Sequence, residues 1–122
     1  MFKLLAVAAV LFSLVAPVFA QIEPQALVGV WEGQWSYREQ RGMKTGPITI
    51  TITKVENGKV YGKTEAQGSQ ENTSYSWVGD ATPTGYSFTS KEGNATTATL
   101  EGGRLHVRSG RGARVTSVLD KK

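Results

Sequence analysis

The sequence predicts an all-β protein, an antiparallel up-and-down meander of about eight short strands. Apolar residues alternate with threonine, serine and charged residues in one segment after another, which is the two-residue period of a half-buried strand. Glycine, asparagine or proline separates these segments, as is typical of tight turns. No segment shows the 3.6-residue period of an amphipathic helix, so the meander leaves room for little helix.

The alternating segments give the expected strands in order. They cover approximately residues 28–37, 47–55, 59–66, 73–79, 85–89, 95–101, 104–109 and 113–119. The segment 22–27, which contains Pro24, is expected to form one short helical turn before the first strand. Strands this short and evenly spaced favour a small closed barrel.

The first 20 residues predict export. Lys3 precedes the apolar run 4–16, and small residues end the segment at Ala20. This is the pattern of a signal peptide cleaved after Ala20, which would leave the single domain 21–122 in the periplasm or secreted. The run is shorter than the roughly 20 residues of a spanning helix, and we expect no transmembrane segment in the mature chain.

The composition favours a binding protein over an enzyme. The chain has no cysteine and one histidine, His106, so thiol catalysis and a metal site are not expected. The sequence shows neither a serine–histidine–aspartate arrangement nor a pair of carboxylates placed for acid–base work. We therefore expect no catalytic residues and no cofactor, and no nucleic-acid partner.

The hairpin between 47–55 and 59–66 can be aligned by keeping its apolar residues on one face. A three-residue loop at 56–58 pairs Ile50 with Thr64, and keeps Lys63 and Glu65 on the solvent face. A two-residue turn would mix the two faces, so the sequence favours the three-residue loop. The turn at 102–103 needs only two residues, because it then pairs apolar with apolar positions on both strands.

Seven aromatic residues can face the barrel interior because each falls on the apolar face of its strand. They are Trp31, Trp35, Tyr37, Tyr75, Trp77, Tyr86 and Phe88. They predict either a packed aromatic core or a ring-lined cavity that binds a small apolar or aromatic ligand, since eight-stranded barrels exist in both forms.

Two segments resemble the calycin superfamily, the avidin-like and lipocalin-like barrels. One is Gly29-x-Trp31 at the start of the first strand; the other is 48–50 followed by 55–62, a strand, a glycine turn and a second strand. The resemblance covers about 40 residues and implies an eight-stranded up-and-down barrel with its mouth at one end. It also implies that a basic residue late in the last strand covers the tryptophan, and Lys121 matches that position.

The C-terminal hairpin concentrates basic residues. Its candidates for anion binding are Arg104, His106, Arg108, Arg111 and Arg114. A three-residue loop at 110–112 would pair Val107 with Val115 and set Arg108 opposite Arg114. Like charges in that position repel unless an anion bridges them. The hairpin is therefore either an anion site or a solvated edge.

Three hypotheses of function follow from these features. The first is a non-enzymatic exported barrel that binds a small apolar or aromatic ligand inside. The second is an envelope-surface protein whose basic hairpin holds an anionic polymer or lipid. The third is an inhibitor or accessory protein of an exported enzyme, which would present the expected loop 37–46.

Overall fold

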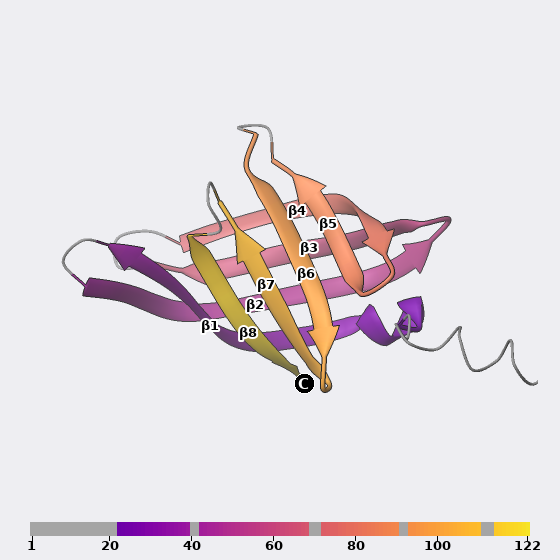
Figure 1. Ribbon diagram of the computed structural model, residues 1–122, viewed down its shortest axis with the longest axis horizontal. Helices are drawn as coiled ribbons and strands as arrows, with labels where there is room; N and C mark the ends of the chain where they lie inside the picture. The colour runs from indigo at the N-terminus through magenta and orange to yellow at the C-terminus, as the bar shows by residue number, and fades with distance from the viewer. Residues whose placement is uncertain (1–21, 40–41, 69–71, 91–92, 111–113) are drawn as a thin grey trace, which may run out of the picture.

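The computed structural model is a closed barrel of antiparallel strands, each paired with the next along the chain and the last with the first (Figure 1). The structure describes residues 22–39, 42–68, 72–90, 93–110 and 114–122, and within them the chain forms eight strands. The predicted up-and-down meander is confirmed. The predicted signal peptide, 1–20, lies outside the described residues.

The strands match the predicted segments closely, except that the second and fourth are longer and the eighth lies two residues further along the chain. They are β1 (Gly29–Glu39), β2 (Gly42–Glu56), β3 (Lys59–Gln67), β4 (Asn72–Thr82), β5 (Gly85–Thr89), β6 (Ala95–Glu101), β7 (Arg104–Ser109) and β8 (Val115–Lys121). In the described part of the chain, no helix is long and apolar enough to cross a bilayer.

One end of the barrel is closed by the predicted helical turn, the 3-10 helix η2 (Pro24–Leu27). The Leu27 side chain is fully buried. The Gln25 amide donates a hydrogen bond to the Val55 carbonyl at 3.0 Å, and the Ile22 amide donates one to the Pro83 carbonyl at 3.0 Å. These contacts fix the helix across the end where β1 begins and β8 ends, which we call the closed end. The opposite end is the open end.

Trp31 and Lys121 join the closed end to the seam between β1 and β8. The two residues pair across the seam, and the Lys121 Nζ lies 5.5 Å from the centre of the Trp31 ring. The same Nζ donates a hydrogen bond to the Ala26 carbonyl at 3.0 Å, and the Trp31 Nε1 donates one to the Leu27 carbonyl at 2.9 Å. The expected cover of this tryptophan by Lys121 is confirmed.

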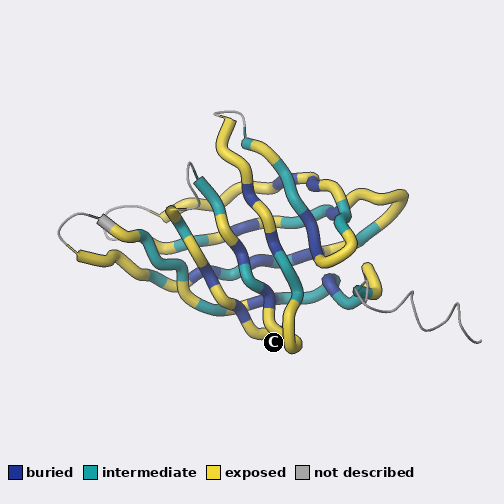
Figure 2. The backbone as a smooth tube through the Cα atoms, in the orientation of Figure 1, coloured by how far each residue is buried: buried dark blue, intermediate teal, exposed yellow. Residues whose placement is uncertain are grey.

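The core occupies the middle and the closed end of the barrel (Figure 2). Its largest fully buried side chains come from almost every strand: Trp31, Tyr86, Leu27, Ile50, Ile52, Leu105, Leu119 and Val60. Alternate residues of each strand enter this core, as the two-residue period requires.

The β2–β3 hairpin keeps the predicted register but reaches it by a different turn. Ile50 pairs with Thr64, as expected. The turn has two residues and not three, because Asn57 (φ 53°) and Gly58 (φ 77°) are both left-handed, the conformation of a type I′ turn. The additional residue is absorbed by a β-bulge at Thr53, which lies between the paired positions 52 and 54.

The prediction of a long loop at 37–46 is wrong. β1 and β2 continue to pair through this segment, to Glu39 opposite Gly42. Main-chain hydrogen bonds hold a strand whether or not its side chains are apolar, so the polar and glycine-rich composition did not end the sheet here. The described part of the segment is therefore a paired hairpin.

Candidate functional site

The inner face of the barrel becomes progressively more exposed toward the open end. On β4, Trp77 is 7 % exposed, whereas Tyr75, two residues nearer the open end, is 43 % exposed. On β1, Trp31 is buried and Trp35 is only half-buried. Inward-pointing side chains therefore fill the closed half and leave a cavity in the open half.

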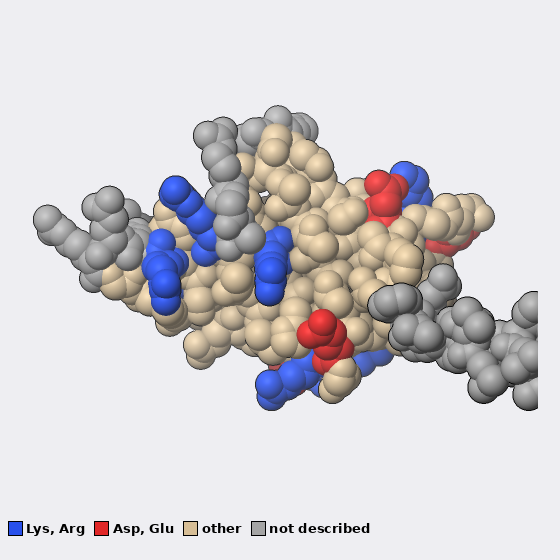
Figure 3. All heavy atoms as spheres, viewed as in Figure 1, with Lys and Arg blue, Asp and Glu red and all other residues tan. Residues whose placement is uncertain are grey.

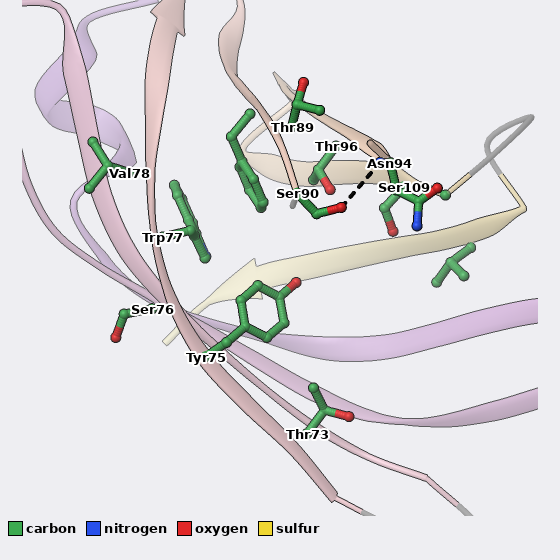
Figure 4. Close-up of a pocket in the computed structure, with 13 residues that line it drawn as sticks. Thr73, Tyr75, Ser76, Trp77, Val78, Thr89, Ser90, Asn94, Thr96 and Ser109 are labelled. Carbon is green, nitrogen blue, oxygen red and sulfur yellow. Dashed lines mark hydrogen bonds between the residues drawn. The ribbon is translucent and has the colours of Figure 1, made fainter. Parts of the chain in front are cut away.

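The first lobe of this cavity lies against β4, β5 and β6 and has a volume of about 790 Å³. Tyr75 and Trp77 project into it from β4, while Thr96 and Ser109 face them from the other side (Figure 4). A hydrogen bond of 3.1 Å from the Asn94 amide to the Ser90 hydroxyl shapes its rim. Aromatic rings thus form one wall and hydroxyl groups the other.

The second lobe lies against β1, β2 and β3 and has a volume of about 800 Å³. Trp35, Ile48 and Ala66 line it. Both lobes are bounded by the same four residues, which are Thr73, Tyr75, Ser109 and Val115. The lobes therefore form one site at the open end, and each is of the size that holds a small organic ligand.

Trp77 is held in place by its neighbours on two strands, β3 and β5. Its ring stacks on Tyr86 (centroids 4.7 Å apart) and on Phe88 (4.6 Å). Its Nε1 donates a hydrogen bond to the Thr64 hydroxyl at 2.9 Å. The ring also covers Gly62, where a Cβ atom would lie 2.4 Å from it. The first lobe therefore has a rigid aromatic wall before any ligand arrives.

Trp35 is fixed in the second lobe by a comparable hydrogen bond. Its Nε1 donates to the Gln67 carbonyl at 3.0 Å, which ties β1 to the end of β3 across the intervening strand. The ring remains half-buried. One face of the indole is therefore available to a molecule in the cavity while its polar edge is already satisfied.

Tyr86 lies beneath the first lobe with a polar group that has no partner. The side chain is fully buried, and its hydroxyl accepts and donates no hydrogen bond among the described residues. Burial raises the pKa of the Tyr86 hydroxyl well above its usual range, and the neighbouring Tyr75 adds to the rise. The hydroxyl therefore stays protonated and uncharged at neutral pH.

The cavity wall is chemically neutral. Among the described residues that line the two lobes, none is Asp, Glu, Lys, Arg or His. No group of three or more potential metal ligands occurs in the part of the chain that the structure describes. Rings and hydroxyl groups can stack on and hydrogen-bond to a small molecule, but they provide no acid–base pair.

Four of the seven aromatic residues predicted to bind ligand come together around the cavity. They are Trp35, Tyr75, Trp77 and Phe88. Tyr86 lies directly below them, stacked on Trp77. Trp31 belongs to the closed end and Tyr37, although on the same face of β1, lies outside the lining of both lobes. The packed core and the cavity, posed as alternatives, occupy different halves of one barrel.

The predicted pairing of Arg108 with Arg114 is wrong. Arg108 lies opposite Thr116, because β7 and β8 pair two residues out of the predicted register. A shift of two residues leaves every side chain on its predicted face, so alternation alone could not detect it. Val107 consequently pairs with Ser117 in place of Val115.

Two of the other predicted anion-binding residues have acidic neighbours. Arg104 Nε forms an ion pair with Asp120 at 2.9 Å, and His106 lies 3.8 Å from a Glu101 oxygen. Arg111 lies outside the described residues. Arg114 immediately precedes β8 and is exposed. Arg104, His106 and Arg108 occupy alternate positions of β7 and so share its outer face, as the sequence predicted.

The sequence reasoning missed the polar half of the cavity. Thr73, Thr96 and Ser109 line it from three strands. Their positions on the inward face follow from alternation. Small hydroxyl residues on such a face are equally compatible with a packed core, so the sequence alone does not assign them to a cavity.

Comparison with protein-family models finds no match for this chain, and neither does comparison with curated proteins.

Proposed function

We propose that this protein is a non-enzymatic barrel that binds a small apolar or aromatic ligand in the cavity at its open end. The observation that carries the proposal is the ring-lined wall beside unfilled space: Trp77 and Phe88 stack at 4.6 Å and both border a lobe of about 790 Å³. Aromatic faces of this kind stack on flat apolar molecules.

The hydroxyl groups of the opposite wall favour a ligand that also carries polar atoms. Thr96 and Ser109 face the rings across the lobe (Figure 4). A molecule that fills the lobe places its own polar atoms within reach of these groups, as ligands commonly do in mostly apolar pockets. A flat ring system with one or two oxygen or nitrogen substituents suits the cavity better than a simple hydrocarbon.

We further propose that the barrel is calycin-like and acts outside the cytoplasm. The support for the first point is the closed end, where Lys121 lies over Trp31 next to Gly29. The support for the second is the signal-peptide pattern of residues 1–20. The neutral lining of the cavity supports a binding protein in preference to an enzyme.

A cavity-filling variant tests the binding proposal. Ser109 borders both lobes, and we expect Ser109→Trp to weaken binding of the neutral fluorescent probe N-phenyl-1-naphthylamine at least tenfold by occupying its space. The measurement is a titration that follows the probe's own emission. Trp35→Ala should weaken binding too, since it removes a wall of the second lobe.

The matched control is Thr97→Trp, which adds the same ring to an exposed position on β6. This variant should bind the probe as the unmodified protein does, and circular dichroism should show both variants folded. Equal binding of the probe by the unmodified protein, Ser109→Trp and Thr97→Trp, or no binding by any of these three, would contradict the proposal.

A further inference from the structure

A patch of basic and apolar residues lies on the outer surface of the barrel, over β7, β8, β1 and β2, from the open end to the middle of the strands. Its members, which we call the outer patch, are all exposed: Arg38, Met43, Arg108, Arg114 and Val118. Met43 is 58 % exposed and Val118 is 42 % exposed. The patch does not belong to the cavity, whose lining contains none of these residues.

The register of the closing strands brings two of the arginines together. Arg38 pairs with Met43 across β1 and β2. The pairing of β1 with β8 ends at Tyr37 opposite Val115, and Arg38 and Arg114 are the next residues beyond this pair, one on each side of the seam. This neighbourhood depends on closure of the barrel and does not exist within the C-terminal hairpin alone.

Arg108 completes the cluster from the other side of β8. It pairs with Thr116, which pairs in turn with Ser36 of β1. Diagonal neighbours on one face of a sheet lie about 7–8 Å apart. Since Ser36 and Thr116 are small, they leave the long arginine side chains free to reach a common ligand above the sheet.

Arg38, Arg108 and Arg114 form no ion pair with another side chain that the structure describes. The ion pairs found there join other residues, such as Arg104 to Asp120 and Lys122 to Glu32, toward the closed end. Figure 3 shows basic side chains gathered over one part of this face, with acidic ones elsewhere. Neighbouring positive charges repel one another, so a bound anion would stabilise this arrangement.

The two exposed apolar residues decide which kind of anion fits best. Met43 lies directly beside Arg38, and Val118 is two residues from Thr116 on the same face of β8. Exposed apolar side chains beside cations suit a lipid surface, where phosphates lie next to acyl chains. A soluble anionic polymer would offer them nothing apolar to contact.

We propose that the outer patch docks the barrel onto the surface of a membrane that contains anionic phospholipid. Arg38, Arg108 and Arg114 bind lipid phosphates through their planar guanidinium groups, which match phosphate geometry. Met43 and Val118 rest on the acyl boundary. Docking goes beyond ligand binding inside the barrel, and it holds the open end close to the membrane, where apolar molecules are concentrated.

Vesicle sedimentation tests the docking proposal. The protein of residues 21–122 should bind vesicles of phosphatidylcholine mixed with phosphatidylglycerol. It should bind vesicles of phosphatidylcholine alone much more weakly. The triple variant Arg38→Gln/Arg108→Gln/Arg114→Gln should lose about a hundredfold in affinity, from about fivefold for each arginine near an anionic surface. High salt should weaken binding by the unmodified protein.

The matched control removes three positive charges elsewhere on the barrel, as Lys54→Gln/Lys63→Gln/Arg104→Gln. These residues are exposed outside the outer patch, so the control should keep most of its vesicle binding. Loss of affinity equal to that of the patch variant would show a response to net charge alone and overturn the proposal, as would unchanged binding by the patch variant.

Met43→Ser separates a membrane from a soluble anionic polymer. We expect it to weaken vesicle binding several-fold and to leave binding of dextran sulfate unchanged. Tighter binding of dextran sulfate than of vesicles, with no effect of Met43→Ser on either, would show a polymer site and contradict membrane docking. Binding of N-phenyl-1-naphthylamine by the triple patch variant should remain normal, which keeps this test separate from that of the cavity.

Discussion

Replacement of Trp31 by alanine is expected to lower the free energy of unfolding by about 3–5 kcal/mol, the usual cost of removing a large buried ring. The side chain is 1 % exposed and packs where η2 closes the barrel. Its loss would also leave the Leu27 carbonyl without its donor, now 2.9 Å away, and would remove the ring beneath Lys121. Urea unfolding followed by circular dichroism measures the change.

Two further variants separate the causes of that loss. Trp31→Phe keeps much of the ring but removes the indole N–H, and it should cost about 1–3 kcal/mol through the unpartnered Leu27 carbonyl. Met43→Ala, at a side chain that is 58 % exposed, should change stability by less than about 0.5 kcal/mol. A cost for Trp31→Ala no larger than that of Met43→Ala would show that the closed end is not packed as described.

Tyr86 is expected to make the protein less stable as the pH rises above 10. Burial raises the pKa of its hydroxyl in the folded state, whereas the unfolded chain has the usual value near 10. Below that pH the hydroxyl is protonated in both states, so it adds no pH dependence. Above it the unfolded state alone loses the proton, and stability should fall by about 1.4 kcal/mol per pH unit from this group.

The Tyr86→Phe variant isolates this effect. It removes the hydroxyl that has no hydrogen-bond partner and keeps the ring that stacks on Trp77. At neutral pH it should be as stable as the unmodified protein or more stable by about 1 kcal/mol. Unfolding free energies measured from pH 8 to pH 11 should diverge between the two proteins above pH 10. Parallel curves would mean that the hydroxyl is solvated in the folded state.

The sequence predicted the faces of the strands more reliably than their alignment. Alternation assigned Ile50 and Thr64 to one face and paired them, as the structure confirms. It could not locate the bulge at Thr53, because a bulge and a longer turn give the same faces beyond them. The same limit explains the error between β7 and β8, where Arg108 lies opposite Thr116.

The candidate cavity was predictable in composition but not in position. The inward direction of Trp35, Trp77 and Phe88 follows from their spacing along the strands. The helix η2 closes only one end of the barrel, and this decides which rings are packed and which border open space. The segment 22–27 predicts a helical turn but not the end of the barrel that the turn covers. Packing against other strands decides that placement.

The position of the outer patch follows in part from antiparallel pairing of the last strand with the first. Antiparallel closure of the barrel sets Trp31 opposite Lys121 at one end of the seam and Tyr37 opposite Val115 at the other. Arg38 and Arg114 follow that last pair directly. The loop that the sequence predicts at 37–46 ends the expected first strand at residue 37, so the prediction leaves Arg38 outside the seam. Pairing across the closing seam, rather than charge within one hairpin, brings the basic residues together.

The three tryptophans provide the most direct test of binding inside the open half of the barrel. Trp35 and Trp77 border the cavity, whereas Trp31 is buried at the closed end. In nitrogen-15 NMR spectra, addition of N-phenyl-1-naphthylamine should shift the indole N–H signals of Trp35 and Trp77 and leave that of Trp31 in place. Shifts confined to Trp31, or to residues of the outer patch, would contradict a ligand site in this cavity.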